Sequence, residues 1–191
     1  MKLILHNRGN YKELLTFKKA TVIFDLTYHF CQKYLSKGDR TVDQMIQAAR
    51  SGKQNIAEGS AAAATSSETE LKLMNVARAS FQELLTDYED YLRVRDLEQW
   101  TADDPRCIKT RQVSIKHNDS GFYRDAIKKR NDETIANIAI TLLHQEDYML
   151  RRLIERLQID FLKNGGIKEQ MYQARINYRN KNNSNNSNST N

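Results

Sequence analysis

Residues that could carry catalysis or bind a metal are scattered along this chain. The four histidines are His6, His29, His117 and His144. None of them belongs to an HExxH pair or a Cys/His cluster. Cys31 follows His29 by two residues, which puts the two side chains on different faces of a helix. Asp87, Glu89 and Asp90 are typical of the solvated side of a helix. With no phosphate-binding glycine pattern either, we predict no catalytic residue, no metal, no cofactor and no enzyme activity.

Positive charge is the other chemical feature of the sequence. The 191 residues carry a formal net charge of +6, which suggests contact with a polyanion or simply an ordinary basic protein. Basic side chains interleaved with Phe122 and Tyr123 suit nucleic-acid backbones and stacked bases. The alternative for residues 100–131 is a solvated, partly helical crossover. The candidate nucleic-acid-binding residues are Arg106, Lys109, Arg111, Lys116, Arg124, Lys128, Lys129, Arg130, Lys168, Arg175 and Arg179.

Composition predicts a helical, non-membrane protein of one domain. Hydrophobic residues make up 39% of the chain, enough for a core, and one proline with seven glycines leaves few helix breakers. No apolar run approaches the roughly 18 residues that span a bilayer. The first residues lack the features of a secretory signal. Two cysteines do not make a disulfide framework, so we expect a reducing, cytoplasmic compartment.

Apolar periodicity predicts an all-α chain with four long helices. We expect them at residues 11–37, 41–58, 67–99 and 132–163, arranged as an antiparallel up-down four-helix bundle over 11–166. The expected organisation around them is an N-terminal extension at 1–10, an insertion at 100–131 between helices three and four, a basic helical suffix at 167–179 and a disordered Asn/Ser tail at 180–191. Pro105 is expected at the first position of a helix, and Asp132 as a helix N-cap.

The first predicted helix is apolar on two sides. We assign one row to the core: Phe17, Ala20, Thr21, Phe24, Tyr28, Cys31 and Leu35. The second row is Leu15, Ile23, Leu26, Phe30 and Tyr34. Because a small bundle offers this second row no internal partner, we expect it to form a subunit contact, or else to be covered by the N-terminal arm. Replacing Ile23 and Phe30 by Glu should then give a folded monomer.

The second and third helices carry polar residues of uncertain role. Ser51, Asn55 and Glu58 share the side opposite the inward row. We expect these residues either to cap the helix and form the turn after it, or to form a polar row that faces another subunit or a ligand. Lys53 should extend its charge outward.

Helix ends and one ion pair can also be predicted here. Thr41 or Asp39 should cap the second helix, and Gly59 should end it in the left-handed conformation. Ser67 with Glu70 reads as a capping box for the third helix. A half-buried Arg78 needs a partner, for which Glu58 is our candidate.

Two of these helices also carry motifs. The residues are Ser51, Asn55-Ile56-Ala57-Glu58-Gly59, Ala77-Arg78-Ala79-Ser80 and Glu83-Leu84. Their spacing resembles the four-helix-bundle proteins first noticed inside 23S rRNA intervening sequences, a group related to accessory proteins of diversity-generating retroelements. The segment from Asp160 to Ile167 with its basic continuation is similar to the subgroup with a C-terminal suffix. The resemblance implies structural roles for Ser51, Asn55, Glu58, Gly59, Arg78, Ser80 and Glu83.

The resemblance also implies an assembly and a partner. Its members often form a ring of five, and in retroelement relatives the basic ring surface binds nucleic acid and a reverse transcriptase. From charge and resemblance together we expect a non-catalytic homo-oligomeric scaffold that binds RNA or DNA backbones, as an accessory to a reverse transcriptase or a ribosomal RNA element. The alternative is a protein–protein adaptor that binds no nucleic acid.

Overall fold

The computed structural model describes residues 11–187, with side chains up to Asn180. This part of the chain is helical and contains no strand, which confirms the predicted all-α class. None of its helices is long and apolar enough to cross a membrane. The predicted extension at 1–10 and the last four residues of the predicted tail lie outside the described residues.

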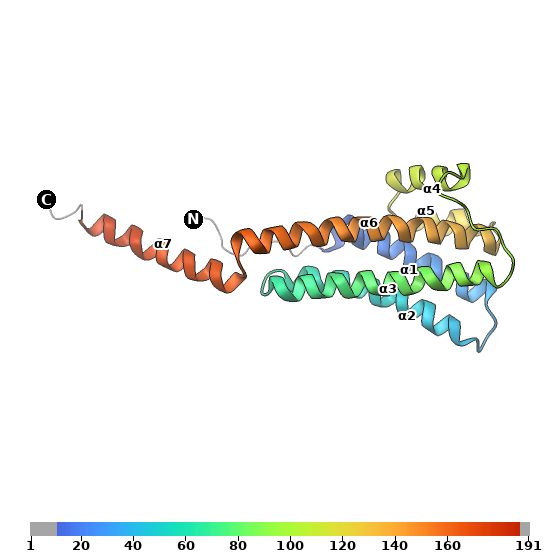
Figure 1. The fold of residues 1–191 in the computed structure, drawn as a ribbon, viewed down its shortest axis with the longest axis horizontal. Coiled ribbons are helices and arrows are strands. Elements are labelled where there is room, and N and C mark those ends of the chain that lie inside the picture. The colour runs from blue at the N-terminus through green and yellow to red at the C-terminus, as the bar shows by residue number, and fades with distance from the viewer. Residues whose placement is uncertain (1–10, 188–191) are drawn as a thin grey trace.

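Four of the long helices, α1, α2, α3 and α6, lie side by side (Figure 1). Their bounds are Leu15–Tyr34 for α1, Arg40–Ala62 for α2, Ser67–Arg93 for α3 and Asp132–Asn164 for α6. A short 3-10 helix, Tyr11–Glu13, precedes α1. The periodicity thus located these helices, although α1 and α3 are shorter than predicted and α2 is longer.

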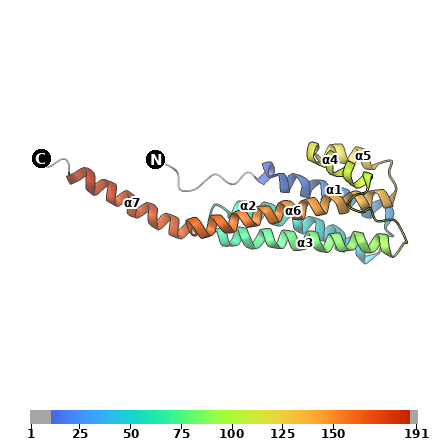
Figure 2. The same cartoon turned by 45° about the horizontal axis from the view of Figure 1, so that its top comes forward.

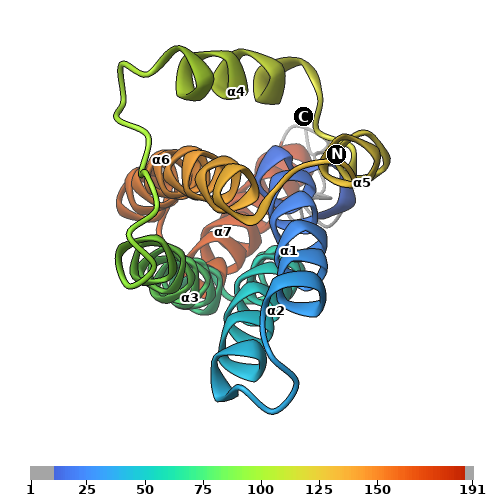
Figure 3. The same ribbon diagram turned by 90° about the vertical axis from the view of Figure 1, so that its right-hand side faces the viewer.

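The region between α3 and α6 folds into two further helices. These are α4, Pro105–Lys116, and α5, Ser120–Ile127. Seen end-on, α4 lies outside α6 and α5 lies beside α1 (Figure 3). Asn137 on α6 fixes the start of this region, because its amide donates to the carbonyl of Glu98 at 2.8 Å and its side-chain oxygen accepts from the backbone N–H of Trp100 at 2.7 Å.

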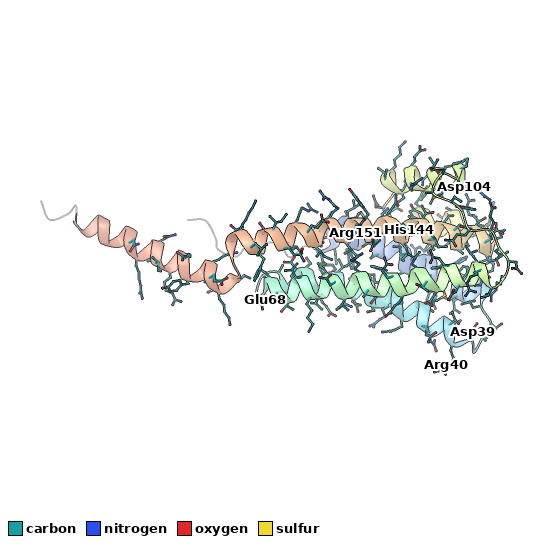
Figure 4. All side chains as sticks on the ribbon, viewed as in Figure 1. Asp39, Arg40, Glu68, Asp104, His144 and Arg151 are labelled. Carbon is teal, nitrogen blue, oxygen red and sulfur yellow. The ribbon has the colours of Figure 1, made fainter. Side chains whose placement is uncertain are left out.

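Helix ends follow capping chemistry, with some differences from the predicted residues. Asp39 caps α2 by accepting from the N–H of Thr41, and Pro105 opens α4 as expected. Figure 4 shows Asp39 and Asp104 at the starts of their helices. Ser66, and not Ser67, caps α3, while Asn131, and not Asp132, caps α6. In each case the cap is the residue just before the predicted one.

Gly59 does not end α2 in a left-handed conformation. The helix continues to Ala62, and Gly59 is buried inside it. A Cβ at this position would lie 3.1 Å from Cε of Met74 and 3.2 Å from Cβ of Leu73 on α3. The glycine therefore serves close helix packing, and the alanines after it extend α2 because alanine has the highest helix propensity.

The predicted faces of α1 were wrong. From the row assigned to a subunit contact, Ile23 and Phe30 are 0% exposed and Leu26 is 1% exposed. Phe30 packs edge-on against Tyr91 of α3, with ring centroids 4.7 Å apart. Tyr28, assigned to the core, is instead 51% exposed. The row through Ile23 and Phe30 is the main core face, and it provides no subunit contact.

Helices of the insertion account for this error. Helix α5 packs against the outer side of α1, where Ile127 lines a groove together with Phe24 and His29. Helix α4 provides a hydrogen-bond partner for Lys19, a buried charge on α1. The side of α1 that contains Phe24, which was assigned to the core from the sequence, is thus covered within the molecule by α5.

Helices α2 and α3 pack closely at Gly52. A Cβ at this position would lie 2.5 Å from Cζ of the buried Phe81 ring. Such a distance is shorter than any normal carbon–carbon contact, so an alanine here would force the ring or a helix to move. Gly52 therefore sets the separation of these two helices.

Helix α7 spans Ile167–Ser187 and projects beyond the ends of the other helices (Figure 1). It is longer than the predicted suffix at 167–179 and includes residues 180–187 of the predicted Asn/Ser tail. Asparagine and serine are weak helix formers, but the run contains no glycine or proline to break the helix. Gly165, at φ +68°, separates α6 from α7 at the predicted Asn164-Gly165-Gly166 stop.

Because Ile23 and Phe30 are buried, replacing both by Glu is no longer expected to give a folded monomer. The variant with Ile23→Glu and Phe30→Glu should fail to fold, because each change puts a charge into the core at a cost of several kcal/mol. Far-ultraviolet circular dichroism and thermal unfolding are the measurements. A Tyr28→Glu control on the exposed side of the same helix should keep the wild-type melting curve to within a few degrees. A folded, cooperative double variant would contradict the core assignment.

Candidate functional site

The excess positive charge of the chain lies in two segments. Residues 100–131 contain eight basic and four acidic residues, and residues 167–179 contain three basic and one acidic. These excesses of four and two account for the whole net charge of +6, so the remainder of the chain is balanced. The insertion and the suffix are therefore the parts that would attract a polyanion.

Structure separates these two basic segments. Helices α4 and α5 lie together at one end of the long axis, and α7 lies at the other end (Figure 2). One molecule therefore presents two basic regions and no single basic site. A polyanion that contacted both would have to run along the length of the molecule.

Several of the predicted basic residues are free to contact a phosphate. Lys109, Lys116 and Lys129 are exposed, and in the described part of the chain no ion pair joins them to a carboxylate. Further exposed residues of the predicted set are Arg124, Arg130, Lys168, Arg175 and Arg179. An exposed cation without a carboxylate partner keeps its full attraction for phosphate.

Other predicted contacts are engaged within the protein. Arg106 is paired with Asp104 at 2.6 Å and with Glu98 at 2.8 Å. Lys128 is paired with Asp125 at 2.7 Å, although both side chains are exposed. The half-buried Arg111 donates to the carbonyl of Ala102. These three side chains are positioned by their own partners, so the free lysines are better candidates for phosphate contact.

Aromatic stacking on bases is only partly available. Tyr123 is 5% exposed, so its ring belongs to the core and the predicted stacking role is wrong for it. Phe122 is 37% exposed, but its ring already stacks on His117 with centroids 4.1 Å apart. Backbone contact by lysines is thus better supported than base stacking.

The residues of the two sequence motifs hold helices together. The hydroxyls of Ser51 on α2 and Ser80 on α3 lie 2.9 Å apart, and Asn55 donates to the backbone oxygen of Ser51 at 2.8 Å. The polar row predicted on α2 is therefore divided: Ser51 faces α3, whereas Glu58 is exposed. As predicted, Lys53 is not buried, and its ammonium lies 4.1 Å from the centre of the Phe24 ring.

Arg78 has a different partner from the one predicted. Its Nε donates to Asp147 on α6 at 2.6 Å, and Gln82 donates to the same oxygen at 2.9 Å. The predicted partner Glu58 is exposed on α2. Glu83 is exposed too, as its predicted position facing away from the core requires.

Two charged side chains are buried at the junction of α1, α4 and α6. Lys19 is 4% exposed, and its ammonium donates to the carbonyl of Ser114 at 2.9 Å and to the hydroxyl of the same residue. Ser114 in turn donates to Gln145 at 2.5 Å. Burial lowers the pKa of Lys19 to about 8, an effect that the negative charge of Glu146 partly opposes.

Glu146 is 0% exposed, and neither carboxyl oxygen has a hydrogen-bond partner. Burial raises its pKa well above the ordinary value of 4.5, with Lys19 acting in the opposite direction. The sequence contained a signal for this residue, since Glu146 lies four residues from both Leu142 and Leu150 in the core stripe of α6. Lys19 likewise lies four residues before Ile23.

The buried thiol and the histidines were the other groups that the sequence offered for chemistry. Cys31 is buried as predicted, and burial raises its pKa to about 12, which disfavours the nucleophilic thiolate. His144 lies on α6, and Figure 4 shows its place along the helix near Arg151. Among the described residues, no group of three or more His, Cys, Asp or Glu side chains could hold a metal ion.

Comparison with known proteins found no relative of this chain. No protein-family model matches the chain, and no curated protein or solved structure is significantly similar to it.

Burial of Glu146 makes stability depend on pH. The folded protein holds this carboxyl proton to a higher pH than the unfolded chain does. The contribution of the protonated carboxyl to the free energy of unfolding is therefore fully present below about pH 4.5, and it is lost as pH rises toward the raised pKa. Replacing Glu146 by Leu should therefore raise the free energy of unfolding at pH 7, by about 1–3 kcal/mol for an unsatisfied buried group. Urea unfolding of both proteins at several pH values measures this difference in the free energy of unfolding.

The control is Glu83→Leu, which removes an exposed carboxylate from α3. Its free energy of unfolding should stay within about 0.5 kcal/mol of the wild-type value. The gain from Glu146→Leu should widen as pH rises above 4.5. A gain that does not change with pH would mean that burial leaves the pKa of this carboxyl at its unfolded value.

Proposed function

We propose that this protein is a non-catalytic scaffold that binds RNA or DNA through its sugar–phosphate backbone. One observation carries the proposal: all of the net positive charge lies in the insertion and the suffix. Lys109, Lys116 and Lys129 of the insertion are exposed and have no carboxylate partner within the described part of the chain. Contacts of this kind depend on charge and little on sequence. Affinity should therefore fall steeply with salt.

We interpret the long helices α1, α2, α3 and α6 as the antiparallel up-down bundle that the motif resemblance implies. On that interpretation α4 and α5 are the insertion between the third and fourth helices. The resemblance to 23S rRNA intervening-sequence proteins makes a reverse transcriptase or a ribosomal RNA element the expected context. A cytoplasmic location fits the two buried free thiols of Cys31 and Cys107.

Matched triple variants test nucleic-acid binding. Lys109→Gln, Lys116→Gln and Lys129→Gln together should weaken binding of a structured RNA about tenfold or more at about 50 mM salt, and should reduce the slope of log K against log salt by about 2 to 3. The control is Lys37→Gln, Arg50→Gln and Lys72→Gln, which removes three exposed charges from α2, α3 and the loop before α2. Fluorescence anisotropy measures both.

Equal loss in the two triple variants would show that net charge matters and the insertion does not. Failure of the wild-type protein to bind structured RNA or duplex DNA at about 50 mM salt would overturn the proposal. Circular dichroism of all three proteins confirms that the changes leave the helices intact.

A second candidate function is a protein–protein adaptor or homo-oligomer, and α7 favours it. Five large apolar side chains are exposed near the end of α6 and along α7: Ile159, Leu162, Met171, Tyr172 and Tyr178. None of the α7 side chains described is fully buried. Exposed large apolar side chains on a projecting helix are typical of a protein contact surface. We propose this end, in place of the buried row of α1, as the contact of a homo-oligomer; a ring of five is the size implied by the resemblance.

Light scattering tests the assembly. Replacing Tyr172 and Tyr178 by Ser should lower the molar mass of the assembly at micromolar concentration, because it removes two large side chains worth about 1.5–3 kcal/mol each when buried. The matched control replaces the exposed Val76 and Val94 of the α3 region by Ser and should leave the mass unchanged. A wild-type protein that is monomeric at about 100 μM would contradict a homo-oligomer of biological strength.

A further inference from the structure

A cavity of about 700 Å³ lies between α1, α4 and α6, together with the segment that follows α3. Its volume is in the range of sites that enclose a small organic molecule. It lies on the inner side of α4, where Ser114 and Cys107 are buried, and not on the exposed basic surface. Any ligand that it holds is therefore separate from a nucleic acid bound to the lysines of α4.

The cavity wall is cationic. Lys19 and Arg111 line it, together with His144, and no Asp or Glu is among its lining residues. The Lys19 ammonium has three N–H donors, and both of its hydrogen bonds go to Ser114. One donor of a buried cation is thus left for another acceptor. A positively charged wall without carboxylates favours an anion and disfavours a cation.

Two further polar atoms at the wall lack partners. The indole Nε1 of Trp100 and the side-chain oxygen of Asn118 are buried, and neither has a hydrogen-bond partner among the residues that the structure describes. Both residues line the cavity. A buried polar atom without a partner is costly, so these positions are satisfied when a bound molecule supplies an acceptor to Trp100 and a donor to Asn118.

The wall also has a large apolar part. It includes the side chains of Leu15, Ile115, Ile140 and Met149 and the ring of Tyr148. An inorganic anion would leave this surface in contact with water. A molecule with an apolar body covers it and gains free energy from the area removed from water.

We propose that this cavity is a binding site for a small organic acid, whose carboxylate accepts hydrogen bonds from Lys19 and Trp100 and whose apolar body packs against α4 and α6. Glu146 lies behind Lys19 and does not line the cavity. Because burial raises its pKa, its carboxyl competes little for the lysine charge. The carboxylate of a ligand therefore supplies the negative charge that the buried ammonium lacks.

Trp100 is the only tryptophan of the chain, so its fluorescence reports on this cavity. The full-length protein is titrated with phenylacetate, octanoate, the neutral phenylacetamide and the cationic phenethylammonium. Phenylacetate should change the tryptophan emission and saturate below about 1 mM. Phenylacetamide and phenethylammonium should bind at least about tenfold more weakly, because they lack the charge that Lys19 recognises.

Matched variants test the role of Lys19. Lys19→Met should remove the preference for phenylacetate over phenylacetamide, whereas Lys18→Met, which removes a neighbouring lysine that is less buried and pairs with Glu13, should keep it. The Lys109→Gln, Lys116→Gln, Lys129→Gln triple variant should bind phenylacetate as the wild type does. This last result keeps the cavity test independent of nucleic-acid binding.

Three results would overturn the proposal. They are equal binding of phenylacetate and phenylacetamide by the wild type, no emission change with either acid up to about 10 mM, and an acid preference that survives Lys19→Met. The first two comparisons use the wild-type protein only, so they decide the question even where a variant is unstable.

Discussion

The hydrogen bonds from Lys19 on α1 to Ser114 on α4 connect the long helices to the insertion. Lys19 lies on the core face of α1, where an ammonium without partners would cost several kcal/mol. Ser114 reaches it only because α4 packs against α6, and Gln145 of α6 holds the serine hydroxyl in place. The core face of α1 is therefore complete only when the insertion is folded.

This dependence explains why the insertion is structured despite its high charge. Cys107 and Ser114 face inward from α4, seven residues apart, while Lys109 and Lys116 face outward with the same spacing. One helix thus closes a cavity on one side and presents cations on the other. Tyr123 and Ile127 give α5 a similar inner face against α1. The basic surface is held in place because the inner sides of α4 and α5 pack against α6 and α1.

The sequence predicted the elements better than their faces. The helix positions, the all-α class, Pro105 at a helix start and the stop at Gly165 follow from local chemistry, which acts over a few residues. The faces of α1 depend on what packs against them. Both rows of that helix are apolar, so periodicity alone did not distinguish them, and Tyr28 from the row assigned to the core is half exposed. The cover from α5 and the partner of Lys19 come from residues about a hundred positions away.

In the candidate site, too, the sequence predicted local features but not the contacts between distant residues. Charge counting in the sequence located the basic segments, but it did not show that Arg106 is engaged by Glu98 or that Tyr123 is buried. Glu146 and Lys19 had a signal, a charged residue at a core position of a helical stripe, which is rarely tolerated without a reason. The partner of Arg78 needed the relative rotation of α3 and α6, which local sequence does not contain.

The contact between Gly52 and Phe81 has a consequence for how this protein changes over generations. Any side chain at position 52 requires a smaller group at position 81, and a large ring at 81 requires glycine at 52. Either change alone costs free energy, because a side chain at 52 collides with the ring and a smaller group at 81 leaves a cavity. Substituting the two positions together avoids both costs. In related sequences the pair should covary, and that covariation would mark the α2–α3 interface even where the remainder of both helices has diverged.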